Sequence, residues 1–332
     1  MALGLPDVRV GTWEHPHVPT GCTVVLPPAG TLGAVAVRGA APGTREAAAL
    51  GPAGKLTVCH AVVLAGGSAY GLAAADGVAR ALDADGIGYP VGPWRVPIVG
   101  AAIVLDVAVA FPDARPDAAA GAAAVAAATT DDPAQGAVGA GAGATVAKVA
   151  GLAGAWRGGQ GWAVRRHGDL VVGALVVNNA VGEVVDEDGT VLTPAVAPAG
   201  APRFPLELRS PADAGHGDAP SGPGEGGPTG ATVIGCVVTN ARLDKAEAHR
   251  VADLAHGGVV RAVVPAHTTY DGDALFCLAT GEVETTVDAV AHLAVEAVAE
   301  AARAGPRHAT GRPALSPPSG PTFPAVPGLA DA

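Results

Sequence analysis

The chain has 332 residues, of which 49% are hydrophobic, 15% are charged and only 3% are aromatic. A chain of this length can bury a large core, and with so few aromatic residues Ala and Val must fill it. The formal net charge is −11 and the sequence contains no concentrated run of Lys and Arg. A nucleic-acid partner is therefore excluded, because phosphate binding requires a basic face.

The sequence does not indicate a membrane protein either. The longest apolar stretch, residues 96–105, ends at Asp106 and reaches only half of the roughly 20 residues that a bilayer requires. The first residues, MALGLPDVRVGTW, lack the basic flank and continuous apolar region of a secretory signal. We therefore expect a cytoplasmic protein with no membrane partner.

Neither a metal nor a cofactor is expected. Cys22, Cys59, Cys236 and Cys277 lie far apart with no C-x-x-C pair, which favours buried, unpaired thiols over zinc binding or disulfides. Residues 139–144 fit the G-x-G-x-x-A pattern, but they follow an Ala-rich helical stretch rather than a strand, so a dinucleotide site is not indicated.

Apolar β-branched runs and Ala-rich periodic segments alternate along the chain. The clearest helix start is at Asp244, where Glu247 completes a capping box. In chain order we predict strands at 22–26, 34–38 and 61–65, helices at 70–83 and 116–129, strands at 162–166, 170–178 and 232–239, a helix from 244, a strand at 274–279 and a helix at 283–304. Sheets covered by helices follow from this pattern.

Two segments are dense in Pro and Gly and sustain neither a helical nor a strand period. Residues 194–230 predict a flexible linker, and residues 305–332 predict a disordered tail. The remaining elements of residues 1–304 are expected to form a single domain.

The first linker ends abruptly at Thr232, which opens the apolar segment TVIGCVVTNA. If the Ala231–Thr232 bond were cut, Thr232 would carry a free α-amine, with a pKa of about 8, beside its own hydroxyl. Such an amine can serve as the general base that activates the hydroxyl as a nucleophile. A strand that simply begins with a β-branched residue explains the same letters.

Several ordered motifs resemble the P1 peptidase family of β-aminopeptidases, D-esterases and nylon-oligomer hydrolases. They are TGCTVVLPPAG, VVLAGGSAYGLAAADGVARAL, GAVGAGAGATVAKVAG, GALVVNNAVGEVVD, GATVIGCVVTNARLDKAEAHRVADLAHGGVVRAV and HTTYDGDALFCLATGEV. The resemblance implies a four-layer αββα sandwich of the N-terminal-nucleophile type. It also implies self-cleavage into an α chain, 1–231, and a β chain, 232–332, which together form the sandwich, and a homotetramer of such αβ pairs. Nylon-oligomer hydrolases often have Asn before the cleaved bond, where this chain has Ala231.

The resemblance also implies four partners for Thr232, namely Lys148, Asn179, Asp271 and Asp273. The Asn179 amide can stabilise a developing oxyanion. Lys148 can keep the Thr232 amine unprotonated or bind its hydroxyl. The two carboxylates can orient the nucleophile or hold a cationic substrate amine.

Plain structural roles stay open for these residues. Asn179 can merely end a strand, Lys148 can be a solvated helix residue, and Asp-Gly-Asp is a common turn sequence. Tyr70 is expected to line the substrate pocket, although residues 64–71 also imitate a nucleophile elbow. His267 is interpreted as structural rather than as a base.

The expected function is hydrolysis of peptide-like or 6-aminohexanoate-oligomer amides, or release of N-terminal amino acids. Two alternatives remain. One is acyl transfer of the ornithine acetyltransferase type, and the other is an uncleaved, non-enzymatic scaffold.

Overall fold

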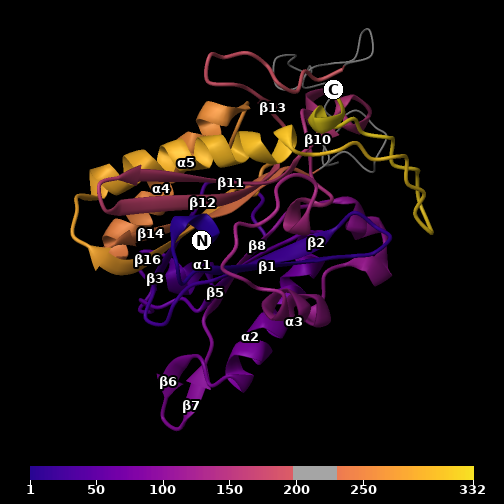
Figure 1. The fold of residues 1–332 in the computed structure, drawn as a ribbon. Helices are drawn as coiled ribbons and strands as arrows, with labels where there is room; N and C mark the ends of the chain where they lie inside the picture. Colours follow the sequence, from indigo (N-terminus) through magenta and orange to yellow (C-terminus); the bar gives the residue numbers. More distant parts are fainter. Residues whose placement is uncertain (197–229) are drawn as a thin grey trace, which may run out of the picture.

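The computed structural model describes residues 1–196 and 230–332 and is built around two five-stranded sheets (Figure 1). The first sheet has the strand order β1-β2-β5-β8-β4. Its strands are β1 (Arg9–Glu14), β2 (Gly21–Leu26), β4 (Thr44–Arg45), β5 (Ala61–Ala65) and β8 (Val99–Ile103). Neighbours in this sheet are antiparallel except β5 and β8, which run parallel.

The second sheet combines strands from both sides of the Ala231–Thr232 bond. Its order is β11-β12-β14-β16-β3, and only β14 and β16 are parallel. Its strands are β3 (Leu32–Val37), β11 (Gly159–His167), β12 (Leu170–Asn179), β14 (Thr232–Ala241) and β16 (Ala274–Val283). The expected sharing of one sheet between the two parts of the chain is therefore present.

The two sheets face each other and each is covered by helices on its outer side (Figure 1). The helices are α1 (Ala47–Leu50), α2 (Ala74–Ala84), α3 (Ala118–Ala126), α4 (Lys245–Ala262) and α5 (Val287–Arg307). Helices α2 and α3 pack on the first sheet, whereas α4 and α5 pack on the second. Leu64, Ile234 and Phe276 belong to the core between the sheets. This order of layers confirms the predicted αββα sandwich.

Most of the predicted elements are present within a few residues of their expected ends. The capping box of α4 is complete, with both the Asp244 and the Glu247 side chains bonded to the backbone. The prediction missed β1 and β8. Strand β8 lies within the apolar stretch at 96–105. The residues after the strand, Val104 and Leu105, are also apolar, so no Gly or Pro marks its end in the sequence.

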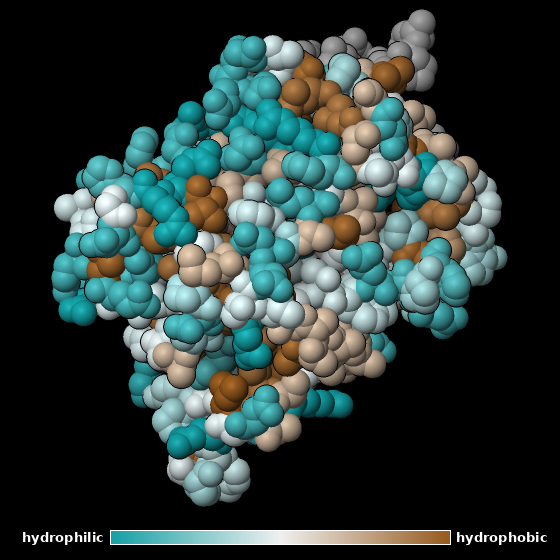
Figure 2. Space-filling view, viewed as in Figure 1, coloured by the Kyte–Doolittle hydropathy of each residue, from teal (hydrophilic) through white to brown (hydrophobic). Residues whose placement is uncertain are grey.

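Among the described residues, three short antiparallel pairs of strands lie outside the main sheets. They are β6 (Tyr89–Val91) with β7 (Trp94–Val96), β9 (Thr145–Val146) with β10 (Trp156–Arg157), and β13 (Glu183–Val184) with β15 (Val263–Val264). On the face seen in Figure 2, hydrophobic residues form several small groups separated by hydrophilic ones. Within the two described ranges, every helix falls short of the length and apolar character needed to cross a bilayer.

The C-terminal segment differs from the predicted disordered tail at 305–332. Helix α5 continues to Arg307, and the following residues fold back on themselves through bridges between Arg312 and Val326 and between Leu315 and Phe323. Phe323 and Val326 are buried, and their apolar area stabilises this segment in spite of its Pro-rich composition. Of the predicted linker at 194–230, residues 197–229 lie outside the described residues.

Candidate active site

Thr232 is the first residue of β14 and lies between the two groups of residues that the sequence associates with it. On one side it is the antiparallel partner of Asn179, the last residue of β12. On the other side, Ala231 forms a bridge with Asp271, three residues before β16 begins. The sheet order β12-β14-β16 thus brings residues more than 90 positions apart in sequence to the start of one central strand.

The peptide carbonyl between Ala231 and Thr232 carries two hydrogen bonds. The Thr232 hydroxyl donates to the Ala231 oxygen, and the Gly272 N–H donates to the same oxygen at 3.0 Å. A side chain at Gly272 would obstruct this approach, because a Cβ there would lie 3.1 Å from Thr232 Oγ1 and 2.5 Å from the Ala41 oxygen. The carbonyl is therefore polarised, with a hydroxyl beside it.

Lys148 is not a solvated helix residue, because its side chain is only 1% exposed. It opens the short 3₁₀ helix at Lys148–Ala150. Its Nζ donates to the Asn179 backbone oxygen and to the Gly230 oxygen, both at 2.8 Å, and to Asn179 Oδ1 at 3.2 Å. Burial lowers the pKa of this ammonium group to about 7, and the charge of Asp271 only partly opposes the change.

Asn179 is the last residue of β12 and is also hydrogen-bonded to Lys148 beside Thr232. Its interpretation as a strand end is therefore compatible with its interpretation as a site residue. Its Oδ1 accepts from the Thr145 N–H at 2.9 Å as well as from Lys148. Its Nδ2 donates to the Leu105 oxygen at 3.0 Å. Since a side-chain amide carries two N–H hydrogens, these bonds fix the orientation of the group and leave a second hydrogen for a ligand.

Asp271 and Asp273 are both buried, and each is held by a different partner. Asp271 Oδ2 accepts from the N–H and the hydroxyl of Thr268, both at 2.7 Å. Its Oδ1 is buried and has no hydrogen-bond partner among the described residues. Burial, followed by the nearby charge of Asp273, raises the pKa of Asp271.

Asp273 connects the strand after Thr232 to His267. Its Oδ1 accepts from the Val233 N–H, and its Oδ2 lies 2.6 Å from His267 Nδ1. Burial alone would lower the pKa of His267, but the hydrogen bond and the charge of Asp273 outweigh it, so the net change is upward. The expectation of a structural role for His267 is compatible with this position, although the residue contacts the site directly.

Sequence reasoning missed Gly272 and Thr268. Gly272 acts through its backbone N–H, and because nearly every residue has this group, the sequence gives no signal for it. The Asp-Gly-Asp motif was interpreted only through its carboxylates. Thr268 follows His267 in the H-T pair of the motif, and this pair was the available signal for a residue that fixes Asp271.

Tyr70 does not belong to the hydrogen-bonded cluster around Thr232 in the described structure. Its ring is 57% exposed and lies under the Arg115 guanidinium, 3.7 Å from the ring centroid. The loop before it is nevertheless close to the cluster, because the Ser68 N–H donates to the Val104 oxygen, one residue before Leu105. Its role in lining a substrate pocket stays a prediction.

The described residues contain no group of three or more His, Cys, Asp or Glu side chains that could hold a metal ion. All four cysteines are buried and unpaired with one another, as predicted. The site therefore consists of a hydroxyl, a buried amine, an amide and two carboxylates around one peptide bond.

The αββα sandwich places the chain in the fold class of the Ntn hydrolases, and solved structures share it. A β-aminopeptidase of Burkholderia sp. superposes with a TM-score of 0.69 at 21% identity, with 98% of this chain and 90% of that chain covered. An L-aminopeptidase D-Ala-esterase/amidase of Ochrobactrum anthropi, described as a variant of the Ntn hydrolase fold, gives a TM-score of 0.68 at 18% identity over the same shares.

The chain belongs to peptidase family S58, whose match covers residues 4–310. An "uncharacterized aminopeptidase" of Mycobacterium leprae is 43% identical over 304 residues, covering 86% of this chain and 76% of the relative. A 6-aminohexanoate-oligomer endohydrolase of Agromyces sp. is 34% identical over 289 residues, with the same coverage. The predicted P1 peptidase resemblance is confirmed, and the protein is a hydrolase of amide or peptide bonds.

Proposed function

We propose that this hydrolase cuts itself between Ala231 and Thr232 and then uses Thr232 as its catalytic nucleophile. The observation that carries the proposal is the geometry of the bond itself. The Thr232 hydroxyl lies against the Ala231 carbonyl, and the Gly272 N–H donates to the same oxygen at 3.0 Å.

These contacts support the following route for the self-cleavage. Thr232 Oγ1 attacks the Ala231 carbonyl carbon, and the Gly272 N–H stabilises the negative charge that develops on the oxygen. The bond from that carbon to the Thr232 nitrogen breaks, the nitrogen takes the hydroxyl proton, and an ester to Oγ1 remains. Water then hydrolyses the ester, which leaves a carboxylate on Ala231 and a free amine and hydroxyl on Thr232.

The mature enzyme reuses the same groups on an external amide. The free α-amine of Thr232 accepts the proton of its own hydroxyl, and the second Nδ2 hydrogen of Asn179 is available to the oxyanion. Lys148 loses its contact with Gly230 if that chain end moves away, and this frees one N–H for the nucleophile or the substrate. In the intact chain Thr232 is only 4% exposed, so cleavage also serves to open the site.

The acidic pair supports substrates with a free amine near the amide. Asp271 Oδ1 is buried without a partner in the described ranges, and a cationic amine would satisfy it. Peptide-like amides, ω-amino-acid oligomers such as 6-aminohexanoate oligomers, and N-terminal amino acids on peptides all fit this chemistry. Membership of a peptidase family favours hydrolysis over the acyltransferase and scaffold alternatives.

The first experiment tests self-cleavage. Intact mass and denaturing electrophoresis of the purified protein should give two fragments, and sequencing of the smaller one should begin at Thr232. Thr232→Ala should remain a single chain of 32.1 kDa. Thr239→Ala, on the same strand, is the matched control and should be cleaved normally. A wild-type protein that stays at 32.1 kDa for days, or a Thr232→Ala protein that is cut, contradicts the proposal.

The second experiment tests substrate recognition. A panel of amides with free and with blocked amino ends is assayed on the wild type and on Asp271→Asn. The wild type should prefer free amines, and the substitution should reduce this preference. If blocked and free substrates react equally well, the carboxylates do not recognise an amine.

The expected homotetramer of αβ pairs is also part of the proposal. It is supported by the hairpin of β6 and β7, which projects from the body of the molecule (Figure 1) and exposes 69% of Trp94 and 45% of Val96. Light scattering on the wild type and on Trp94→Ser tests it. A wild type of monomeric mass would refute the assembly.

A further inference from the structure

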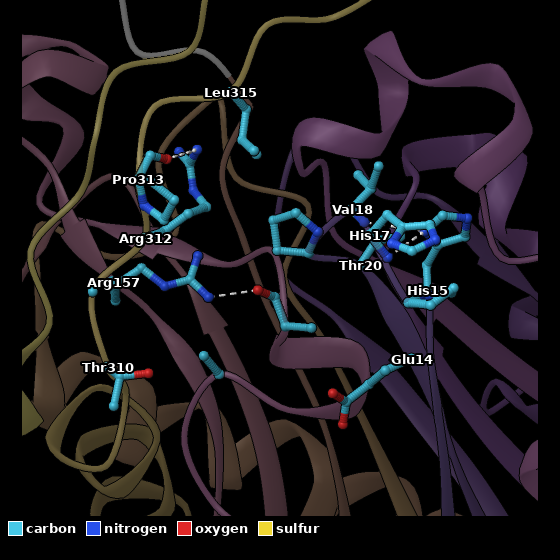
Figure 3. A pocket seen from close by; sticks show the side chains of 15 residues that line it. Glu14, His15, His17, Val18, Thr20, Arg157, Thr310, Arg312, Pro313 and Leu315 are labelled. Atoms are coloured by element: carbon cyan, nitrogen blue, oxygen red, sulfur yellow. Dashed lines mark hydrogen bonds between the residues drawn. The ribbon is translucent and has the colours of Figure 1, made fainter.

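A second polar pocket lies apart from Thr232, and Figure 3 shows it from close by. It has a volume of 340 Å³ and is lined by residues 14–20 on one side and by Arg157 with residues 310–313 and Leu315 on the other. In Figure 3, Arg157 and Arg312 enter from the side opposite His15 and His17. The lining does not include Thr232 or any of its four predicted partners.

Both arginines of this pocket are more than nine-tenths buried. Arg157 is 2% exposed and Arg312 is 8% exposed. Nη2 of Arg157 donates to the Ala142 oxygen at 2.5 Å, and Nη1 of Arg312 donates to the Pro313 oxygen at 3.1 Å. Nε and Nη1 of Arg157, and Nε of Arg312, are buried without a hydrogen-bond partner in the described part of the chain.

Unpaired donors of this kind are costly, because a guanidinium removed from water must be compensated by acceptors. Burial, followed by the charge of Arg312, lowers the pKa of Arg157 to about 10, and Asp106 opposes this change. Asp106 is already occupied, since it accepts from the Thr20 hydroxyl at 2.7 Å and from the backbone N–H groups of Gly67 and Ala108. Glu14, the acidic lining residue, accepts from the Gly139 N–H.

We infer that this pocket binds a small oxyanion, the carboxylate or phosphate group of a compact ligand, between Arg157 and Arg312. Planar guanidinium groups are suited to such groups because they present parallel N–H donors. The anion would supply acceptors to the free Nε and Nη1 atoms and would separate the two positive charges. The proposal does not depend on the proposed function of Thr232.

The pocket is connected to Asn179 by two short paths. Arg157 on β10 pairs with Thr145 on β9, whose N–H donates to Asn179 Oδ1. Thr20, which also lines the pocket, donates to Asp106, and Asp106 directly follows Leu105, whose oxygen accepts from Asn179 Nδ2. An anion on Arg157 would therefore stabilise the β9–β10 pair, whose Thr145 N–H holds the Asn179 amide in place.

The experiment is a calorimetric titration of the full chain with inorganic phosphate and, separately, with succinate, at constant ionic strength and with chloride as the reference. Saturable binding of at least one of the two anions is expected. Arg312→Gln should weaken it by about tenfold or more, since a hydrogen bond to a charged group is lost. Arg157→Gln should do the same. Arg95→Gln removes an exposed arginine from β7 and is the matched control, so it should bind like the wild type.

The anion series also distinguishes the sources of the ligand. Tighter binding of phosphate indicates a phosphorylated ligand, and tighter binding of succinate indicates a carboxylate ligand. Thr232→Ala should bind with unchanged affinity, which separates this site from catalysis. Should neither anion bind better than chloride, or should Arg95→Gln weaken binding as much as Arg312→Gln, the inference is overturned. Because Arg312 lies in the C-terminal segment, its variant tests the site even if Arg157→Gln does not fold.

Discussion

The burial of Lys148 leads to a quantitative prediction about stability. We consider Lys148→Met in the Thr232→Ala background, which is expected to remain uncleaved. Methionine keeps the unbranched shape of lysine and most of its length, because it is shorter by the terminal atom only, and it removes the charge. The variant leaves the Asn179 and Gly230 backbone oxygens without their Nζ donor. The free energy lost with these hydrogen bonds does not vary with pH, because backbone oxygens do not titrate.

The pH-dependent part follows from the pKa of Lys148, which burial lowers from 10.5 to about 7. Between these values the unfolded chain binds one more proton than the folded chain, so the free energy of unfolding rises with pH. At about 1.4 kcal/mol per pKa unit, the whole difference amounts to about 5 kcal/mol. Below pH 7 this stability is missing, and it returns as the pH approaches 10.5.

Denaturant unfolding measured from about pH 6 to about pH 9 includes roughly two pH units above the folded-state pKa of about 7. Over this interval the free energy of unfolding should rise by about 3 kcal/mol. The parent should gain this much relative to Lys148→Met over the interval. Lys55→Met, which removes an exposed lysine, should follow the parent. Equal pH dependence in the parent and in Lys148→Met would refute the reasoning, because a solvated amine would titrate alike in the folded and unfolded chains.

Three further predictions concern the site. Gly272→Ala should slow self-cleavage, measured by the decay of the intact band, because its Cβ would lie 3.1 Å from Thr232 Oγ1; Gly257→Ala on α4, where a Cβ has ordinary room, should be cleaved at the normal rate. Asn179→Ala in the processed enzyme should reduce kcat by roughly 10²–10³, the usual loss of an oxyanion donor, and a change in KM alone would contradict that role. His267 has a raised pKa through Asp273, so the stability it adds relative to His267→Gln should be full below pH 6.5 and decline as the pH rises past its folded-state pKa; an increase with pH would contradict the pairing.

The layered fold was predictable because its signals are local. Nearly continuous apolar runs such as residues 170–178 are buried on both faces, and the Asp244 capping box marks a helix start from four adjacent letters. Strand β1 escaped prediction because Arg9, Thr12 and Glu14 interrupt its apolar character. The C-terminal segment was misjudged because composition describes the average residue, whereas a few buried side chains such as Phe323 determine whether a segment packs.

The candidate site could be predicted only in part, for a physical reason. The order of strands in the second sheet brings Asn179, Thr232 and Asp271 together, and Lys148 reaches them from a 3₁₀ helix through its side-chain hydrogen bonds. No spacing along the chain encodes these contacts. Only the family resemblance assigned them together. Their charge states were also unreadable, because the same lysine has an ordinary pKa on a surface and a lowered one when it is buried.

The contact that best supports self-cleavage is made by a backbone N–H, a group that every residue except proline carries. The Gly272 N–H reaches the Ala231 oxygen because residue 271 pairs with residue 231 as an extra bridge beyond the start of β14 and β16. The glycine is required by the space beside Thr232 Oγ1 rather than by a side-chain function. Asp271 and Asp273 therefore also fix the backbone of this turn. By binding Thr268, His267 and the Val233 N–H, they hold the Asp271–Asp273 turn so that its central N–H donates to the Ala231 oxygen, at the proposed cleavage bond.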